Sequence, residues 1–311
     1  MASSRTSVVT GQVLRVLRAH ETEPDGLAQA EPDGLAQARE RLLEARSHRV
    51  RPGLDDKQLT SWNALMISAL ADAGAVLERE EYLAAAADCA SFLLTERRGA
   101  DGQLLRTPAV HAFLDDHAFL LEALLTLYEA TFEPRWYEEA IATAQAIIER
   151  FADPERGGFF TTSEDHEDPV ARRKDLDDSP IPSGNSAAAF GLLRLALLSG
   201  EGGYERHALG VLRLLYPLAG RHPQAFGHLL RAIDFYLGPV REVAIVGPDR
   251  DALVRTVRSR FRPHIVLAAG YGKVPLLEGR EAVDGKAAAY VCEHFVCQAP
   301  VTTPEQLEAA L

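Results

Sequence analysis

Three short polar clusters hold the residues of this chain best suited to chemistry, because each sets carboxylates beside other hydrogen-bonding groups. They read DDKQLTSWN from Asp55, FLDDHAF from Phe113 and DDSPIPSGNS from Asp177. Paired carboxyl groups can divide general-acid and general-base roles when their surroundings separate their pKa values. Cleavage of a glycosidic bond uses two such groups. The clusters therefore indicate carbohydrate chemistry.

Nine residues of the clusters are candidates for a site. The candidate catalytic residues are Asp56, Asp115, Asp116, His117 and Asp178, and the candidate substrate-binding residues are Trp62, Asn63, Ser183 and Asn185. His117 could shuttle protons, or it could be an ordinary hydrogen-bonding residue of a first helical turn. Trp62 could stack on a sugar ring, or it could belong to the core.

A purely structural interpretation of the same clusters is helix capping. Thr60, Asp115 and Ser183 are good N-cap residues, and such caps contribute about 1 kcal/mol each. Acidic groups near a helix start also suit the helix dipole. Capping accounts for one acidic residue at each helix start. It accounts less well for the pair of adjacent aspartates that occurs in all three clusters.

The elements that position these clusters are helices, since apolar residues recur at helical spacing after each cluster. The pattern predicts seven helices, over about residues 60–77, 82–94, 116–130, 134–151, 186–198, 204–215 and 223–237. An eighth is possible over Ala36–Ala45.

The loops between these helices alternate in length. Short links join residues 77 to 82 and 130 to 134, whereas the links over residues 96–114 and 152–182 are long. Such alternation is typical of a ring of helix pairs with an inner wall and an outer shell, and a superhelical stack is the rival arrangement. In a ring, the three clusters meet at one mouth. We therefore expect Asp56, Asp116, Asp178 and Asn185 to face a common cavity.

The pattern changes near Gly238. Two β-type runs, REVAIVG and PHIVLAAG, flank a helical run, and AAAYVCEHFVC could be a third strand. This order predicts a small α/β subdomain. The expected division is residues 1–50, 51–237 and 238–311. The first part holds a tandem EPDGLAQA duplication, which we interpret as a tolerated loop insertion.

Composition limits the partners and the compartment. The chain has 311 residues and a net charge of −12, without a basic block, so we expect no nucleic-acid partner. No apolar run approaches the ~18 residues of a membrane span. Three cysteines make no disulfide framework, so we expect a reducing cytoplasm.

No cofactor or metal is expected either. The C-x4-C pair Cys292 and Cys297, even with His294, lacks a fourth zinc ligand, so buried free thiols are the better interpretation. Phosphate-binding and dinucleotide-binding glycine motifs are absent from the sequence.

The quoted clusters, together with GGFFTT, PSGNS and AYVCEHFVCQAPVT, resemble the thioredoxin-fused proteins of the YyaL and spermatogenesis-associated type. The resemblance covers residues 51–311. It implies a mainly α fold, an (α/α)6 toroid similar to N-acylglucosamine 2-epimerases and six-hairpin glycosidases. It assigns no catalytic residue.

Two departures from that family shape the functional hypotheses. No segment here matches the family's thioredoxin-like domain, and the first helical hairpins of the toroid are missing or replaced. The resemblance thus implies an incomplete toroid that acts on or binds carbohydrate, epimerase-like or glycosidase-like, with a small-molecule sugar as ligand. The alternative is a non-catalytic scaffold or relic whose open edge binds a second copy, another protein or a separate thioredoxin-like chain.

Overall fold

The computed structural model describes residues 33–164, 171–178, 180–293 and 296–311. The chain divides between Asp56 and Lys57 into two compact units, six residues beyond the expected boundary at residue 50. The first unit contains α1 (Asp33–Ser47), where the sequence predicts a possible helix. In the described part of the chain, no helix is both long and apolar enough to cross a membrane.

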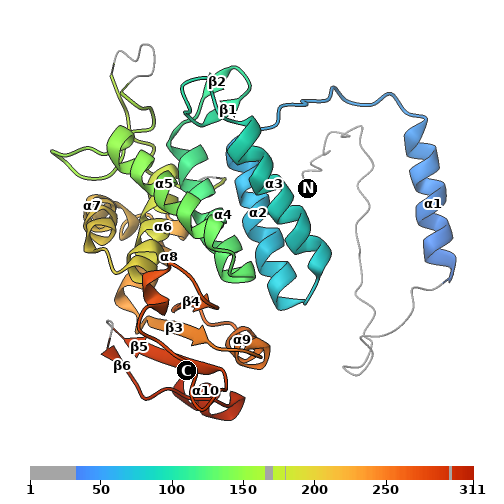
Figure 1. The fold of residues 1–311 in the computed structure, drawn as a ribbon. Helices are drawn as coiled ribbons and strands as arrows, with labels where there is room; N and C mark the ends of the chain where they lie inside the picture. Colours follow the sequence, from blue (N-terminus) through green and yellow to red (C-terminus); the bar gives the residue numbers. More distant parts are fainter. Residues whose placement is uncertain (1–32, 165–170, 179, 294–295) are drawn as a thin grey trace, which may run out of the picture. The chain divides into compact units, whose positions relative to one another are not determined.

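The helices of the second unit form two layers. The inner row consists of α2 (Thr60–Val76), α4 (Leu114–Thr131), α6 (Gly184–Ser199) and α8 (Gly227–Leu237). The outer row consists of α3 (Glu80–Glu96), α5 (Pro134–Phe151) and α7 (Gly202–Ala219). Each inner helix packs against the next, and each outer helix packs against the inner helix before it (Figure 1). This arrangement is the predicted incomplete α/α toroid, built from three hairpins and a single helix.

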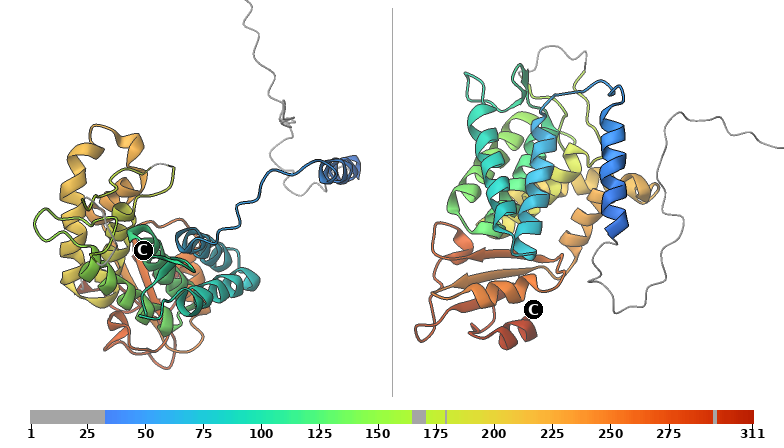
Figure 2. Two further views of the ribbon diagram at one scale, coloured as in Figure 1. Left: turned by 90° about the horizontal axis from the view of Figure 1, so that it is seen from above. Right: turned by 90° about the vertical axis from the view of Figure 1, so that its right-hand side faces the viewer.

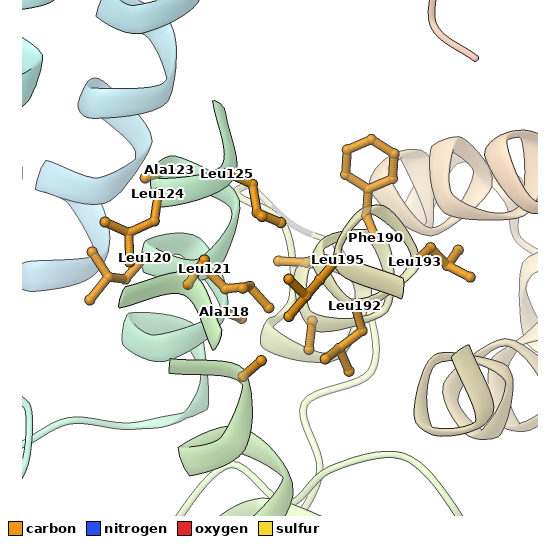
Figure 3. Packing of buried hydrophobic residues seen from close by; sticks show 14 of the residues in the cluster. Ala118, Leu120, Leu121, Ala123, Leu124, Leu125, Phe190, Leu192, Leu193 and Leu195 are labelled. Atoms are coloured by element: carbon orange, nitrogen blue, oxygen red, sulfur yellow. The ribbon is translucent and has the colours of Figure 1, made fainter. Parts of the chain in front are cut away.

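The centre of the core lies between α4 and α6, which are buried on almost every side because apolar residues surround both helix axes. Leu120 and Leu124 point toward α2, whereas Leu121 points toward α6 (Figure 3). The two helices approach closely at Gly191, where an added Cβ would lie 2.9 Å from the Leu121 side chain. Small residues at such crossings let the inner helices stand side by side.

Helix α8 begins later than the sequence pattern indicates. A 3₁₀ turn, η1 (Pro223–Ala225), comes first, and Phe226 has a non-helical backbone with φ −139° and ψ 35°. The first turn of α8 is then capped from a distance, since the Asp178 carboxylate accepts the N–H groups of His228 and Leu229 at 2.8 and 3.1 Å. The cap, rather than Pro223, sets the start of this helix.

The predicted C-terminal α/β elements are present. They comprise β3 (Arg241–Val246), α9 (Asp251–Arg258), β4 (Ile265–Ala269), η2 (Pro275–Leu277), β5 (Ala288–Glu293), β6 (Val296–Cys297) and α10 (Pro304–Ala310). The sheet order is β4-β3-β5-β6, with β3 and β4 parallel and the other pairs antiparallel. A second, two-stranded sheet pairs β1 (Leu105–Thr107) with β2 (Val110–His111).

The larger sheet packs against one end of the helical array (Figure 2). Strand side chains alternate between faces, so Val243 and Ile245 join α9 and α10 in one apolar cluster, whereas Ala244 and Val246 join the core of the helices. Helices and sheet therefore form one compact unit, and the boundary expected at Gly238 lies inside it.

The expectation of free thiols at Cys292 and Cys297 is wrong. Strands β5 and β6 form a hairpin whose register places these two residues directly opposite each other, and they form a disulfide. Cys89 remains a free thiol. The spacing alone does not reveal the pairing, because it depends on the register of the two strands.

Candidate functional site

Asp116 connects the starts of two inner helices. Its side chain is fully buried; Oδ1 accepts the Ser61 N–H of α2 at 2.9 Å, and Oδ2 accepts the Phe113 N–H at 3.0 Å. Arg106 Nη1 lies 3.0 Å from the carboxylates of both Asp115 and Asp116. Burial, reinforced by the charge of Asp115, raises the pKa of the Asp116 carboxyl despite Arg106.

Two of the three predicted N-caps are wrong. Leu59 and Phe113 occupy the cap positions of α2 and α4, and Thr60 and Asp115 lie one and two residues further along. The Thr60 hydroxyl instead donates to the Leu105 carbonyl at 2.6 Å. The prediction for Ser183 is correct, since its Oγ accepts the backbone N–H of Ser186.

Asn185 acts as a substitute peptide group for the loop before it. Its amide donates to the Phe159 carbonyl at 2.9 Å and to the Asp175 carbonyl at 3.1 Å, and its Oδ1 accepts the Phe159 N–H at 2.8 Å. The side chain is wholly buried. Asp178, besides capping α8, accepts the Ser183 N–H at 2.8 Å. The polar turn before α6 is thus a junction of three segments.

The other candidates from the first cluster are scattered. Trp62 is 59% exposed, so it is not a core residue. Asn63 donates to the Leu59 carbonyl one helical turn earlier, at 2.8 Å. Asp56 is exposed and belongs to the first unit.

Two cavities lie beside the outer helix α5. The first, of about 310 Å³, lies between α4 and α5 and is lined by His117. The second, of about 500 Å³, lies between α5 and α7 and is lined by Tyr137, Tyr204 and His207 among others. Asp116, Asp178 and Asn185 line neither of them. Their side chains serve the packing around the helix starts, and of the nine candidates only His117 faces one of these cavities.

A charged cluster on the inner helices was not foreseen from the sequence. The centre of this inner-wall cluster is a pair between Glu122 of α4 and His228 of α8, whose Oε1 and Nε2 atoms lie 2.6 Å apart. Arg231 Nη1 approaches the other Glu122 oxygen at 3.9 Å, and its guanidinium lies 4.0 Å from the centre of the Phe190 ring. The polar groups of this contact come from α4 and α8, and α6 contributes the Phe190 ring.

The inner-wall cluster continues along α4 toward the sheet. Arg194 of α6 donates to Glu129 and to Thr126, at 3.0 and 3.1 Å. Burial raises the pKa of Glu129, with Arg194 opposing. Partial desolvation raises the pKa of Asp72 on α2, although the residue remains exposed, and Arg194 and Arg231 oppose that shift.

The sequence does contain a signal for this cluster. Asp115, Glu122 and Glu129 are spaced by seven residues, which places them on one side of α4, and Arg194 is the only charged residue of α6. A single charge in an otherwise apolar, buried helix requires a partner. The pattern shows that partners exist, but it does not show which helices supply them.

Comparison with known proteins finds relatives that are longer than this chain and match it over part of their length. No model of a known protein family matches the chain. It is 32% identical over 299 residues to spermatogenesis-associated protein 20 of Homo sapiens and of Mus musculus, which covers 88% of this chain and 38% of those proteins. It is 29% identical over 296 residues to an uncharacterised Caenorhabditis elegans protein, B0495.5, covering 87% of this chain and 40% of that protein. The chain therefore spans about two-fifths of the length of these relatives.

Solved structures with a similar fold are more distant. A cellobiose 2-epimerase from Bacillus thermoamylovorans has a TM-score of 0.44 and 14% identity, covering 52% of this chain and 45% of that one. A GH76A α-1,6-mannanase from a Salegentibacter species has a TM-score of 0.44 and 13% identity, covering 58% and 52%. A possible GH105 member from Klebsiella pneumoniae has a TM-score of 0.44 and 15% identity, covering 89% and 75%.

Proposed function

We propose that this homologue of spermatogenesis-associated protein 20 is a carbohydrate-active toroid domain, with its reacting groups in the inner-wall cluster. The observation that carries the proposal is the pair between Glu122 of α4 and His228 of α8, 2.6 Å apart. Side chains of these two types, held within hydrogen-bond reach, are suited to proton transfer. The positive charge of Arg231 beside them suits a substrate that develops negative charge.

The contact between Glu122 and His228 determines which ring nitrogen of His228 can act as a base. An ionised Glu122 accepts the hydrogen on His228 Nε2, which leaves Nδ1 as the basic atom of the ring. A base of this kind can remove a proton next to a sugar carbonyl, the step that an epimerisation requires. Glycosidic cleavage needs two carboxyl groups, and Glu129, whose pKa burial raises, is the candidate for a general acid beside Glu122.

The experiment that tests this proposal follows both reactions at once. The purified chain is incubated with reducing mono- and disaccharides in deuterated water, and NMR follows deuterium incorporation next to the carbonyl and the release of new reducing ends. We expect one of these signals, and we expect Glu122→Gln and His228→Asn to abolish it. The control is Glu138→Gln, which changes an exposed residue of the outer helix α5. Turnover that survives both inner-wall substitutions would exclude the proposed groups.

A second candidate function, a partner-binding scaffold, is favoured by three exposed apolar side chains of α2. Trp62, Met66 and Val76 are 59%, 57% and 59% exposed and recur at helical spacing. Large apolar side chains exposed along one helix can mark an interaction site. Binding of a second copy or of a separate thioredoxin-like chain, without any turnover of sugar, would support this function instead.

A further inference from the structure

The cavity between α4 and α5 is separate from the inner-wall cluster. Its walls include His117 and Leu120 of α4, and its volume is about 310 Å³, at the lower end of the ~300–1,000 Å³ typical of small-molecule sites. Successive residues of a helix are turned by about 100°, so Leu120 and Glu122 face nearly opposite sides of α4. The cavity therefore opens on the outer side of this helix.

His117 presents an unused acceptor to this cavity. Its Nδ1 lies 3.0 Å from the Phe113 carbonyl, and because a carbonyl can only accept, Nδ1 carries the hydrogen and Nε2 is left with a lone pair. The residue is only 6% exposed. Within the described ranges no hydrogen bond reaches Nε2, so this atom can accept one from a ligand. Burial, with smaller effects from Arg150 and Arg98, lowers the pKa of His117 to about 4, so the ring is neutral near pH 7.

The rim of the cavity is already organised. The loop over residues 98–104 is held by a Gly99 N–H bond to the Gln103 carbonyl at 2.8 Å and by Arg98 Nη1 donating to the Gly102 carbonyl at 3.1 Å. Arg150 of α5 donates to Gln103 Oε1 at 2.5 Å. A ligand entering here meets a wall that is fixed by these bonds, which reduces the entropy cost of binding.

The lining defines the class of ligand. Two arginines, Arg98 and Arg150, are balanced by two acids, Asp101 and Glu149, so the cavity has no net charge to recruit an ion. The remaining polar groups, such as Thr143 and Gln145, both donate and accept hydrogen bonds. Hydroxyl groups of a polyol likewise do both, and the small alanine and leucine surfaces of the cavity suit its C–H faces.

We propose that the cavity between α4 and α5 is a second ligand site, which holds a small neutral polyol of monosaccharide size through a hydroxyl that donates to His117 Nε2. This site does not depend on the reaction proposed for the inner wall. A bound ligand supplies the hydrogen bond that Nε2 of His117 otherwise lacks. It also contacts both the inner helix α4 and the outer helix α5.

The test measures binding of D-glucose, D-mannose and D-mannitol to the full chain by ligand-observed NMR and by calorimetry. His117→Asn keeps a side-chain N–H for the Phe113 carbonyl but has no counterpart of Nε2, so it separates binding from folding. We expect at least one of the three probes to bind saturably, with affinity roughly tenfold weaker in His117→Asn, equivalent to about 1.4 kcal/mol. Ala146→Phe, which fills the cavity, is expected to abolish binding. The matched control, His111→Asn, changes an exposed histidine and should leave the affinity unchanged.

Three results would overturn or redirect the proposal of a polyol site. If none of the three probes binds the native chain, the cavity is not a polyol site. If a probe binds equally well to His117→Asn and Ala146→Phe, it occupies another place. Loss of binding in Glu122→Gln alone would assign the sugar to the inner wall, so failure of this site and failure of the proposed function are distinguishable.

Discussion

His117 and Asn185 show how differently two residues from similar polar clusters are used. Asn185 has every polar atom engaged with backbone groups of the preceding loop, whereas His117 has one ring nitrogen engaged and one facing a cavity. A side chain with no remaining hydrogen-bonding capacity stabilises the fold, and one with capacity left can bind a ligand. This difference leads to two predictions at the scale of single residues.

Replacing Asn185 by Ala should destabilise the fold strongly. The change leaves the buried N–H and carbonyl of Phe159 without partners, at about 1–3 kcal/mol each, so we expect the free energy of unfolding to fall by roughly 3 kcal/mol. Ser183→Ala removes only an N-cap and should cost about 1 kcal/mol. Urea unfolding compares the two variants. An Asn185→Ala protein of unchanged stability would show that the amide is not the structural bond we describe.

Stability should also depend on pH through His117. Its folded-state pKa is about 4, below its ordinary 6.5, so between these values the unfolded chain binds a proton that the folded chain does not. The native protein therefore loses stability as pH falls from 6.5 toward 4, by up to about 3 kcal/mol from this residue. Thermal unfolding of the native chain and of His117→Asn over this range measures the effect. Parallel pH profiles for the two proteins would contradict it.

At the scale of elements, the β5–β6 hairpin decides the state of the cysteines. Because its register places Cys292 opposite Cys297, we expect peptide mapping without reductant to find this pair linked and Cys89 alkylated. Closing so short a loop restricts the unfolded chain modestly, so Cys292→Ala with Cys297→Ala should lower stability by about 2 kcal/mol. The side chain of Arg280, on the loop before β5, contacts both sulfur atoms, with Nη2 at 3.3 Å from Cys292 Sγ and 3.2 Å from Cys297 Sγ. Alkylation of all three cysteines in the native chain would rule out the bridge.

At the scale of the whole molecule, the described helices of the second unit end with an exposed apolar side on α2, at Trp62, Met66 and Val76. Covering a large apolar side chain contributes about 1.5–3 kcal/mol, a considerable share of a typical stability of ~5–15 kcal/mol. We therefore predict that the isolated chain self-associates or is marginally stable, and that Trp62→Glu with Met66→Glu gives monomers in sedimentation experiments.

The control for that prediction is Phe261→Glu, which removes an exposed aromatic residue on the loop after α9 and should leave the sedimentation unchanged. A native chain that is a monodisperse monomer and unfolds sharply above ~65 °C, hotter than most mesophilic domains, would show that the helical array needs no partner.

The helices, their alternation in pairs and the β-α-β order near the C-terminus could be predicted from the sequence alone, because hydrophobic periodicity and turn residues act over a few neighbouring positions. Helix starts were less predictable. Leu59 and Phe113 occupy cap positions in place of Thr60 and Asp115. At α4, the Asp116 carboxylate accepts the Phe113 N–H three residues before it. At α2, the same carboxylate accepts the Ser61 N–H from another helix. A cap supplied from a distant segment leaves no local signal.

The candidate sites were decided by the tertiary structure. Glu122 and His228 are 106 residues apart in the chain, and they meet only because α4 and α8 both pack against α6. The direction of His117 depended in the same way on which helices pack against each side of α4. Sequence patterns indicate that a side chain is polar and lies on a helix, but its partners are chosen by the neighbours that packing supplies. For this reason the sequence determined the elements and their order, whereas the polar contacts between them were determined only by the folded chain.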